Sequence, residues 1–149
     1  MNNNKELTIG WKEWGALPEL GIQRIHMKTD TGAKTSAIHT VDYQLYENNH
    51  EEWVRFTVAP VQDDDDTRIE CQLPVKDKRT VTNSGGMKTH RIVVETLLQI
   101  GDWQRPIELT LACRKKMKFR MLLGRQAMRD VCVKPDQAHL IHKQPKTKP

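Results

Sequence analysis

The residues best suited to chemistry lie in the stretch KTDTGAKTSAIHT, residues 28–40. Asp30 is followed at once by Thr31 and Gly32. A carboxylate can activate a water molecule when a second carboxylate about 3 Å away shares one proton with it. Gly32 lacks a Cβ, so the backbone can fold back toward the acid and present N–H donors. The tripeptide occurs once in the chain, so a pair of carboxylates would need a second subunit.

Other catalytic chemistries have weaker signals. The six histidines include no HExxH pair, so the strongest sign of a catalytic zinc site is absent. There is no GxSxG motif and no GxxxxGK[ST] motif, which argues against a serine nucleophile elbow and an ATP-binding P-loop. Four consecutive acids, residues 63–66, lack the spacing and the glycine of a calcium loop and are typical of a solvated hairpin loop. We therefore expect neither a metal nor a cofactor.

Short strands with period-two alternation, separated by Gly, Pro, Asn and Asp, predict an all-β barrel or sandwich. Gly-Asp at 101–102 predicts a hairpin between residues 91–100 and 103–112. GRQAMRD, residues 124–130, is the one helical candidate. The expected strands cover residues 7–11, 22–29, 43–47, 53–59, 69–73, 89–100, 104–113, 121–123, 131–133 and 139–142.

Length and composition indicate one domain, residues 1–142, followed by a basic tail, 143–149, that we expect to be disordered. The three cysteines, without a CxxC pair, suggest core thiols in a reducing compartment. With no apolar run of about 18 residues and no secretory signal, we expect a cytoplasmic protein away from the membrane.

The net charge of +5 favours anionic partners. Nucleic acid is disfavoured, because the four Trp are scattered and do not alternate with Arg or Lys. In RKKMKFRMLLG, a strand would place apolar side chains on one face and Lys116, Lys118 and Arg120 on the other. That basic face is either simply solvated or able to attract an acidic ligand.

Two motifs together resemble the retropepsin-like acid proteases: DTGA at the end of a strand, and later MLLGR, residues 121–125. More narrowly, KTDTGAKTSAIHT, VTNSGGMKTHRIVVET and KMKFRMLLGRQAM…VKPDQAHLI are similar to a bacterial group labelled as ATP-dependent zinc proteases and associated with the glutamate ligase RimK. The three motifs occur in the expected order across residues 9–141.

The resemblance implies a closed acid-protease barrel with one short helix near the C-terminus. It also implies an aspartic peptidase that acts as a homodimer, each subunit supplying Asp30. By the same resemblance, the residues that support the active site are Thr31, Gly32, Ala33, Gly124 and Arg125. The residues of a flap over the cleft are Ser84, Gly85 and Gly86. Retroviral enzymes have an acid after DTGA that pairs with this arginine. Lys34 stands there instead, so Arg125 must find another partner.

A better-understood member of the group is thought to trim glutamate tails that the ligase adds to a ribosomal protein. An acidic peptide is therefore the expected substrate, and the cations that could bind it are Lys28, Lys34, Arg79, Arg91 and Arg120. We expect no dependence on metal or ATP. Alternatives are a non-catalytic peptide-binding module on the same fold, a zinc metallopeptidase as the label suggests, and a nucleic-acid-binding barrel.

Overall fold

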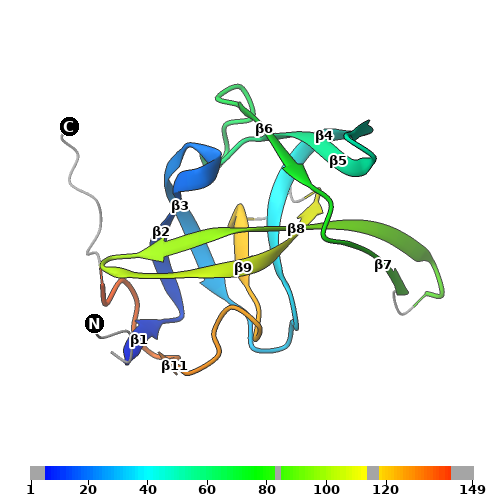
Figure 1. Ribbon diagram of the computed structural model, residues 1–149. Coiled ribbons are helices and arrows are strands. Elements are labelled where there is room, and N and C mark those ends of the chain that lie inside the picture. The colour runs from blue at the N-terminus through cyan, green and yellow to red at the C-terminus, as the bar shows by residue number, and fades with distance from the viewer. Residues whose placement is uncertain (1–5, 83–84, 114–117, 142–149) are drawn as a thin grey trace.

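The computed structural model describes residues 6–82, 85–113 and 118–141 (Figure 1). These residues form eleven strands and one short 3-10 helix. In chain order the elements are β1 (Leu7–Gly10), β2 (Lys12–Leu17), η1 (Pro18–Leu20), β3 (Ile22–Thr29), β4 (Ser36–Asn48), β5 (Glu51–Val58), β6 (Ile69–Pro74), β7 (Asp77–Thr82), β8 (Lys88–Ile100), β9 (Trp103–Ala112), β10 (Met121–Leu123) and β11 (Val131–Lys134).

The main sheet closes on itself, which confirms the predicted closed all-β fold. Its strand order is β10-β3-β2-β8-β9-β4-β5-β6, and β10 also pairs with β4. Strand β10 is parallel to β3 and antiparallel to β4. The ring therefore runs from β10 through β3, β2, β8, β9 and β4 back to β10. A separate parallel pair, β1 and β11, lies beside it.

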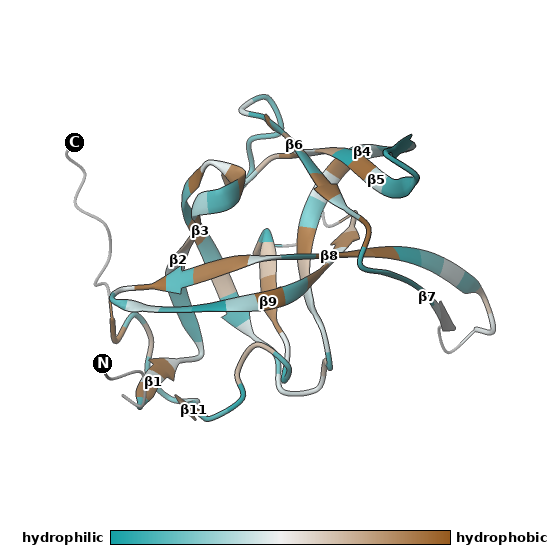
Figure 2. Cartoon of the chain, viewed as in Figure 1, coloured by the Kyte–Doolittle hydropathy of each residue, from teal (hydrophilic) through white to brown (hydrophobic). Residues whose placement is uncertain are grey.

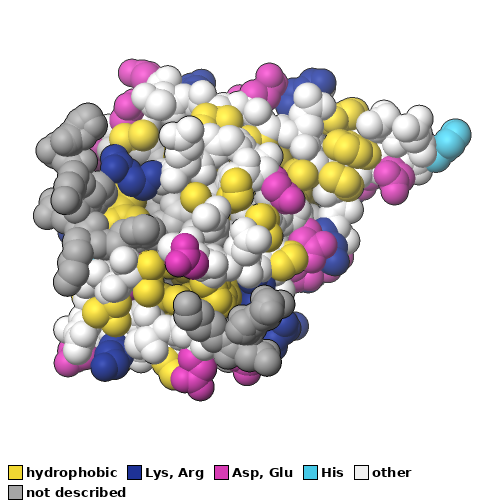
Figure 3. All heavy atoms as spheres, turned by 60° about the vertical axis from the view of Figure 1, so that its left-hand side comes forward, with side chains coloured by type: hydrophobic (Ala, Val, Ile, Leu, Met, Phe, Trp, Pro, Cys, Tyr) yellow, Lys and Arg dark blue, Asp and Glu magenta, His cyan; other side chains and the backbone are white. Residues whose placement is uncertain are grey.

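The inward side chains of the ring are aliphatic and fully buried, as alternation along the strands requires. Figure 2 shows the apolar positions recurring along the barrel strands. Among the largest side chains of this core are Ile25, Met27, Ile38, Leu98, Ile107, Leu109 and Met121. On the face shown in Figure 3, acidic and basic side chains are interspersed with small apolar patches. The positive excess is thus not gathered into a basic stripe on that face.

The helix predicted at residues 124–130 is wrong. Within the described residues this segment is a run of tight turns, closed by Met128 N–H to Arg125 O (3.1 Å) and Val131 N–H to Met128 O (2.9 Å). Asp130 has φ +63°, in the left-handed region, which stops helical continuation. The carbonyls of Ala127 and Arg129 accept hydrogen bonds from the Arg105 side chain, so tertiary contacts replace the helical ladder. We call this segment the 124–130 turn.

Several other local predictions need correction. Strands β2 and β7 were not expected, β4 begins seven residues earlier than predicted (Ser36 rather than 43), and residues 139–141 are not a strand. Cys71 is buried as predicted, but Cys113 and Cys132 are exposed. The described part of the chain contains no helix long and apolar enough to cross a membrane. The predicted tail, 143–149, lies outside the described residues.

A buried carboxylate joins the two ends of the described chain. Glu13 is fully buried in β2, and its Oε2 accepts hydrogen bonds from the N–H groups of Gly10 and Leu140, both at 2.7 Å. Its Oε1 accepts one from Ile141 N–H at 3.3 Å. The segment 135–141 is held further by Trp11 N–H to Gln137 O at 2.7 Å. One acid therefore fixes the segments before β2 and after β11 against each other.

Two histidines form a second link to the same C-terminal segment. The Nε2 atoms of His26 and His139 lie 2.9 Å apart, and the Trp14 ring stacks on His26 with centroids 4.2 Å apart. Burial, followed by the neighbouring His139 and by Lys12 and Lys118, lowers the pKa of His26 from 6.5 to about 4. This imidazole therefore stays neutral well below its ordinary range.

These histidines predict an acid-sensitive stability. Burial and Lys12 also lower the pKa of His139, against the opposing effect of Glu13. Because the unfolded chain then binds more protons than the folded one, stability should fall as the pH drops from 6.5 toward about 4. Carboxylates add their own pH dependence, so the difference between wild type and His26→Phe is the quantity of interest. The variant should show a flatter fall in urea midpoint between these pH values, and an identical profile would contradict the prediction.

Candidate active site

The Asp30 loop begins where β3 ends, and backbone contacts fix its shape. Asp30 N–H donates to Leu123 O at 2.8 Å, which continues the pairing of β3 with β10. Gly32 N–H donates to Asp30 Oδ1 at 3.0 Å, and Ala33 N–H donates to Asp30 O at 3.2 Å. The predicted turn is therefore formed by the predicted acid, whose side chain and carbonyl accept the hydrogen bonds that close it. The turn holds the carboxylate half-exposed at the end of the barrel.

The glycine of the second motif lets β10 pass close to this loop. A Cβ on Gly124 would lie 2.7 Å from the carbonyl carbon of Thr35 and 2.9 Å from that of Lys34. Gly124 N–H donates to the buried Ser36 Oγ at 3.0 Å. The Asp30 loop connects β3 to β4, and β10 pairs with both of these strands. Both ends of the loop therefore lie next to β10. The two motifs, some ninety residues apart in sequence, form one unit.

Gly124→Ala should distort this unit. The added methyl group meets backbone atoms that cannot rotate away, so the loop must shift by several tenths of an ångström. We expect a loss of about 1–3 kcal/mol in the free energy of unfolding, as for other overpacked sites. Urea unfolding measures this loss. Gly21→Ala is a useful contrast, because open space surrounds its Cβ position and its cost arises from φ +77° alone. A Gly124→Ala variant as stable as wild type would contradict the close approach.

Arg125 finds its partner in the backbone. Its Nη1 donates to Thr31 O at 2.9 Å, and its own N–H donates to Ala33 O at 2.8 Å. The next residue, Gln126, donates from its N–H to Lys34 O at 2.9 Å. The question raised by Lys34 is therefore answered: the arginine binds a carbonyl of the Asp30 loop in place of a carboxylate.

The predicted flap is a β-hairpin. Strands β7 and β8 are antiparallel, and the hairpin projects from the barrel (Figure 1). Gly86 has φ +87°, a conformation suited to glycine, and Gly85 lies beside it in the exposed turn. Ser84 lies outside the described residues. At its base, Arg79 Nη1 donates to Thr35 Oγ1 at 3.0 Å, so the hairpin contacts the end of the Asp30 loop.

The structure separates the five cations that were expected to bind substrate. Lys28 and Lys34 are exposed on either side of Asp30. Arg79 is already paired, with Asp77 at 2.8 Å and with Glu108 at 2.9 Å. Arg91 is half-exposed and stands across from Arg79 in the hairpin. Two lysines beside the acid and one arginine in the β7–β8 hairpin thus remain in positions to meet a ligand.

The expectation for Arg120 as an outward cation is wrong. Its side chain is 3% exposed and pairs with Asp65, which also lies 3.3 Å from His39 Nε2. The pKa of the Asp65 carboxyl is lowered, chiefly by its hydrogen bond from Arg120. Phe119 next to it is buried as well, so the strand alternation expected for this basic stretch does not occur. The acidic run 63–66 is a loop, as predicted, but one of its acids neutralises a buried arginine.

Sequence reasoning missed three supporting side chains. Ser36 binds Gly124 N–H, Gln126 Oε1 accepts from Glu108 N–H at 3.1 Å, and Thr35 binds Arg79. Each is an ordinary polar residue without a motif of its own. Ser36 and Thr35 do lie inside the stretch that carries Asp30, which is the one signal that could have indicated them.

Metal-ligating side chains do not converge in the described ranges. No three or more His, Cys, Asp or Glu residues come together there as a metal site would need. Two of the histidines, His26 and His139, contact each other directly through their ring nitrogens.

Comparison of the sequence with known proteins matches the chain to a family of aspartic endopeptidases, in agreement with the exposed Asp30 loop. Residues 8–144 match the family described as RimB-like, retropepsin-like aspartic endopeptidase RimB. A probable alpha-L-glutamate ligase of Desulfotalea psychrophila is 49% identical over 122 residues, covering 82% of this chain and 26% of the relative. A probable alpha-L-glutamate ligase of Shewanella pealeana is 39% identical over 128 residues, covering 86% of this chain and 28% of the relative.

The chain spans only about a quarter of the length of these curated relatives. A solved structure covers it more evenly. The crystal structure of a protein of unknown function from Legionella pneumophila superposes with a TM-score of 0.75 at 26% identity, covering 92% of this chain and 99% of that chain. The similarity to the ligases is therefore local, and the similarity to the Legionella protein extends over the whole domain.

Proposed function

Since the chain belongs to the RimB-like family of retropepsin-like aspartic endopeptidases, we propose that it is a peptidase that acts as a homodimer with one Asp30 from each subunit. The observation that carries the proposal is the shape of the Asp30 loop. Gly32 N–H fixes one carboxylate oxygen, while the acid stays half-exposed at the end of a rigid barrel. Amide hydrolysis by this chemistry needs two carboxyl groups, and each subunit presents one. In the proposed dimer, a two-fold axis brings the second Asp30 carboxyl beside the first.

In this proposal the two Asp30 carboxyls share one proton. The ionised carboxyl takes a proton from a water molecule, whose oxygen attacks the peptide carbonyl, and the protonated carboxyl gives its proton to the carbonyl oxygen. When the tetrahedral intermediate collapses, the C–N bond breaks and a proton passes to the leaving nitrogen. The products are a carboxylic acid and an amine, and the dyad is left with one proton again.

The other parts of the unit have positioning roles in this proposal. Arg125 ties the 124–130 turn to Thr31 O, so the Asp30 loop cannot open away from β10. The β7–β8 hairpin would cover bound peptide and exclude water. Its contact through Arg79 and Thr35 links the position of the flap to the loop beneath it.

We propose an acidic peptide as the substrate. The exposed Lys28 and Lys34 flank Asp30, and the chain carries a net charge of +5. The two relatives described above are named as glutamate ligases, and they are about four times longer than the matching segment. A peptidase segment attached to such a ligase would be well placed to act on glutamate-containing peptides.

The experiment that tests this function is hydrolysis of an α-linked oligoglutamate peptide by wild-type protein and by Asp30→Asn. Release of shorter peptides by wild type alone supports both the mechanism and the substrate class. Binding of the peptide without hydrolysis by wild type would instead favour a peptide-binding module.

A further inference from the structure

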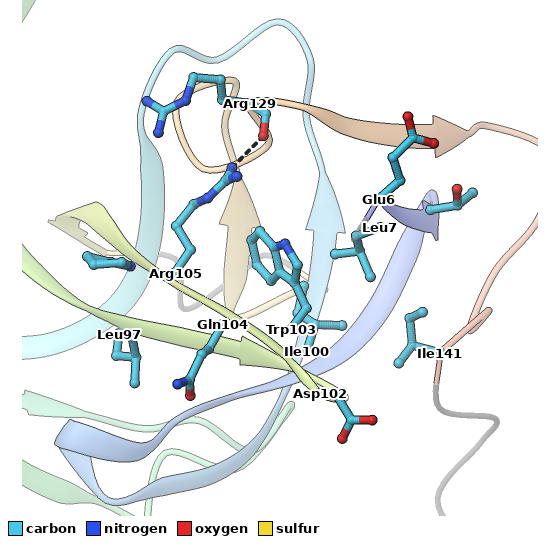
Figure 4. A pocket seen from close by; sticks show the side chains of 12 residues that line it. Glu6, Leu7, Leu97, Ile100, Asp102, Trp103, Gln104, Arg105, Arg129 and Ile141 are labelled. Carbon is cyan, nitrogen blue, oxygen red and sulfur yellow. Dashed lines mark hydrogen bonds between the residues drawn. The ribbon is translucent and has the colours of Figure 1, made fainter. Parts of the chain in front are cut away.

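A groove of about 980 Å³ lies away from the Asp30 loop (Figure 4). It is bounded by β1, by the end of the β8–β9 hairpin and by the 124–130 turn, and Ile141 closes one side. No residue of the 28–40 stretch lines it. A ligand in this groove would therefore contact residues to which neither the motifs nor the proposed mechanism gives a role.

Two arginines stand at one end of the groove, Arg105 from β9 and Arg129 from the 124–130 turn (Figure 4). Arg105 Nη1 donates to Ala127 O at 3.1 Å and also to Arg129 O. Its guanidinium lies over the Trp103 ring, 4.8 Å from the ring centre. These contacts fix the plane of the Arg105 guanidinium before any ligand arrives.

Among the described residues, Arg105 has no acidic partner in direct contact. The hydrogen bonds of Arg105 to described residues go to neutral carbonyls. Burial and the nearby Arg129 lower the pKa of Arg105, while Asp130 has the opposite effect. Arg105 is half-buried and held in place, whereas Arg129 is exposed but close enough to affect the pKa of Arg105, so a carboxylate bound to Arg105 can also pair with the Arg129 side chain.

The other residues that line the groove restrict the kind of ligand that it can bind. Its floor includes the aliphatic side chains of Leu7, Ile100 and Ile141, and Glu6 and Asp102 stand at other points of its lining. Those two carboxylates repel further anionic groups, so the groove suits a ligand that places a single anionic group at the arginine end. An acidic peptide can place one carboxylate on the arginines and its methylene groups on the apolar floor.

We infer that this groove is a second binding site for the acidic peptide substrate, in which a peptide carboxylate pairs with Arg105 and Arg129. The inference rests on the proposed function for the identity of the peptide. The 124–130 turn then has two roles. Arg125 supports the Asp30 loop, and Arg129 binds a part of the peptide substrate that lies farther from Asp30. Such a site would lower KM for longer acidic peptides and leave kcat unchanged.

The test is fluorescence anisotropy with a labelled α-linked hexaglutamate peptide, in the Asp30→Asn background so that the peptide stays intact. Arg129→Gln should weaken binding about 5- to 20-fold, because a charge-assisted pair is lost. Asp102→Asn should tighten binding about twofold, because a repulsive charge is removed. Opposite changes from two surface substitutions cannot both result from misfolding. With cleavable peptide and intact Asp30, Arg129→Gln should raise KM alone.

Arg24→Gln is the matched control, because Arg24 also lies over an indole ring, 5.0 Å from the centre of Trp14, but on β3 and outside the groove. Its affinity should stay within twofold of the parent. Equal affinities for parent and Arg129→Gln, equal losses in Arg129→Gln and Arg24→Gln, or weaker binding by Asp102→Asn would each overturn the inference. Hydrolysis by the Asp30→Asn protein would count against the proposed function alone, since the affinity series does not depend on it.

Discussion

Asp30→Asn is expected to lower kcat/KM on an α-linked oligoglutamate peptide by about 10³-fold or more, because in the proposed mechanism it removes the group that takes and gives the proton. Asn keeps an oxygen at the position of Oδ1, so the hydrogen bond from Gly32 N–H can persist. The loop should therefore keep its shape, and the urea midpoint of the variant should match that of wild type. Initial rates with purified protein measure the effect. Activity within tenfold of wild type would end the aspartic mechanism.

Two controls separate this chemistry from a general charge effect. Asp42→Asn makes the same change at an exposed position on β4 and should leave activity unaltered. Subunit mixing tests the shared site: adding excess Asp30→Asn protein should suppress the wild-type rate, since a mixed dimer has one carboxyl. A rate that stays proportional to the wild-type concentration would show that the two subunits do not build one site.

Glu13→Ala is expected to have the largest effect on stability. The fully buried carboxylate accepts hydrogen bonds from Gly10, Leu140 and Ile141, and Ala leaves these three N–H groups without an acceptor. We expect the free energy of unfolding to fall by about 3–5 kcal/mol. Urea unfolding measures the total, and faster amide exchange at Leu140 should show that the C-terminal segment loosens first. A loss below about 1 kcal/mol would show that the link is dispensable.

The conservative variant Glu13→Gln separates the loss of the charge from the loss of the hydrogen-bond acceptors. Glu13→Gln keeps one acceptor oxygen but turns an amide NH₂ group toward backbone N–H donors, so its loss should be smaller than that of Glu13→Ala but still measurable. Glu51→Ala removes a carboxylate from an exposed position of β5 and should change stability by less than about 0.5 kcal/mol. Equal losses in Glu13→Ala and Glu51→Ala would mean that burial of the acid contributes nothing specific.

These two predictions differ in how far the sequence alone could reach them. Asp30 follows an apolar strand and Gly32 comes two residues later, so the local pattern indicates the turn, and the later MLLGR motif added the acid to the prediction. Glu13 has no such signal. It stands between an exposed-looking lysine and a tryptophan, and nothing nearby in sequence shows that N–H groups more than 120 residues away will converge on it.

The cations near the proposed site show the same limit. Alternation of Lys116, Lys118 and Arg120 with apolar residues indicated an outer basic face. The structure instead buries Arg120 against Asp65, which sits in a loop that looked merely solvated. Local period-two patterning cannot foresee this pair, because its energy depends on a contact between segments 55 residues apart.

The sequence by itself indicated the closed all-β fold through alternation along the strands, the β8–β9 hairpin through its Gly-Asp turn, and the family and Asp30 through the DTGA and MLLGR motifs in their expected order. The tertiary structure decided which side chains support them. Insertion of β10 between β3 and β4 places Arg125 where its side chain donates to the carbonyl of Thr31. Arg105 donates to the carbonyls of Ala127 and Arg129, in the turns that stand in place of the expected helix. The physical reason is that a buried polar group takes whatever partner the packed chain brings to it, and packing is set by long-range contacts.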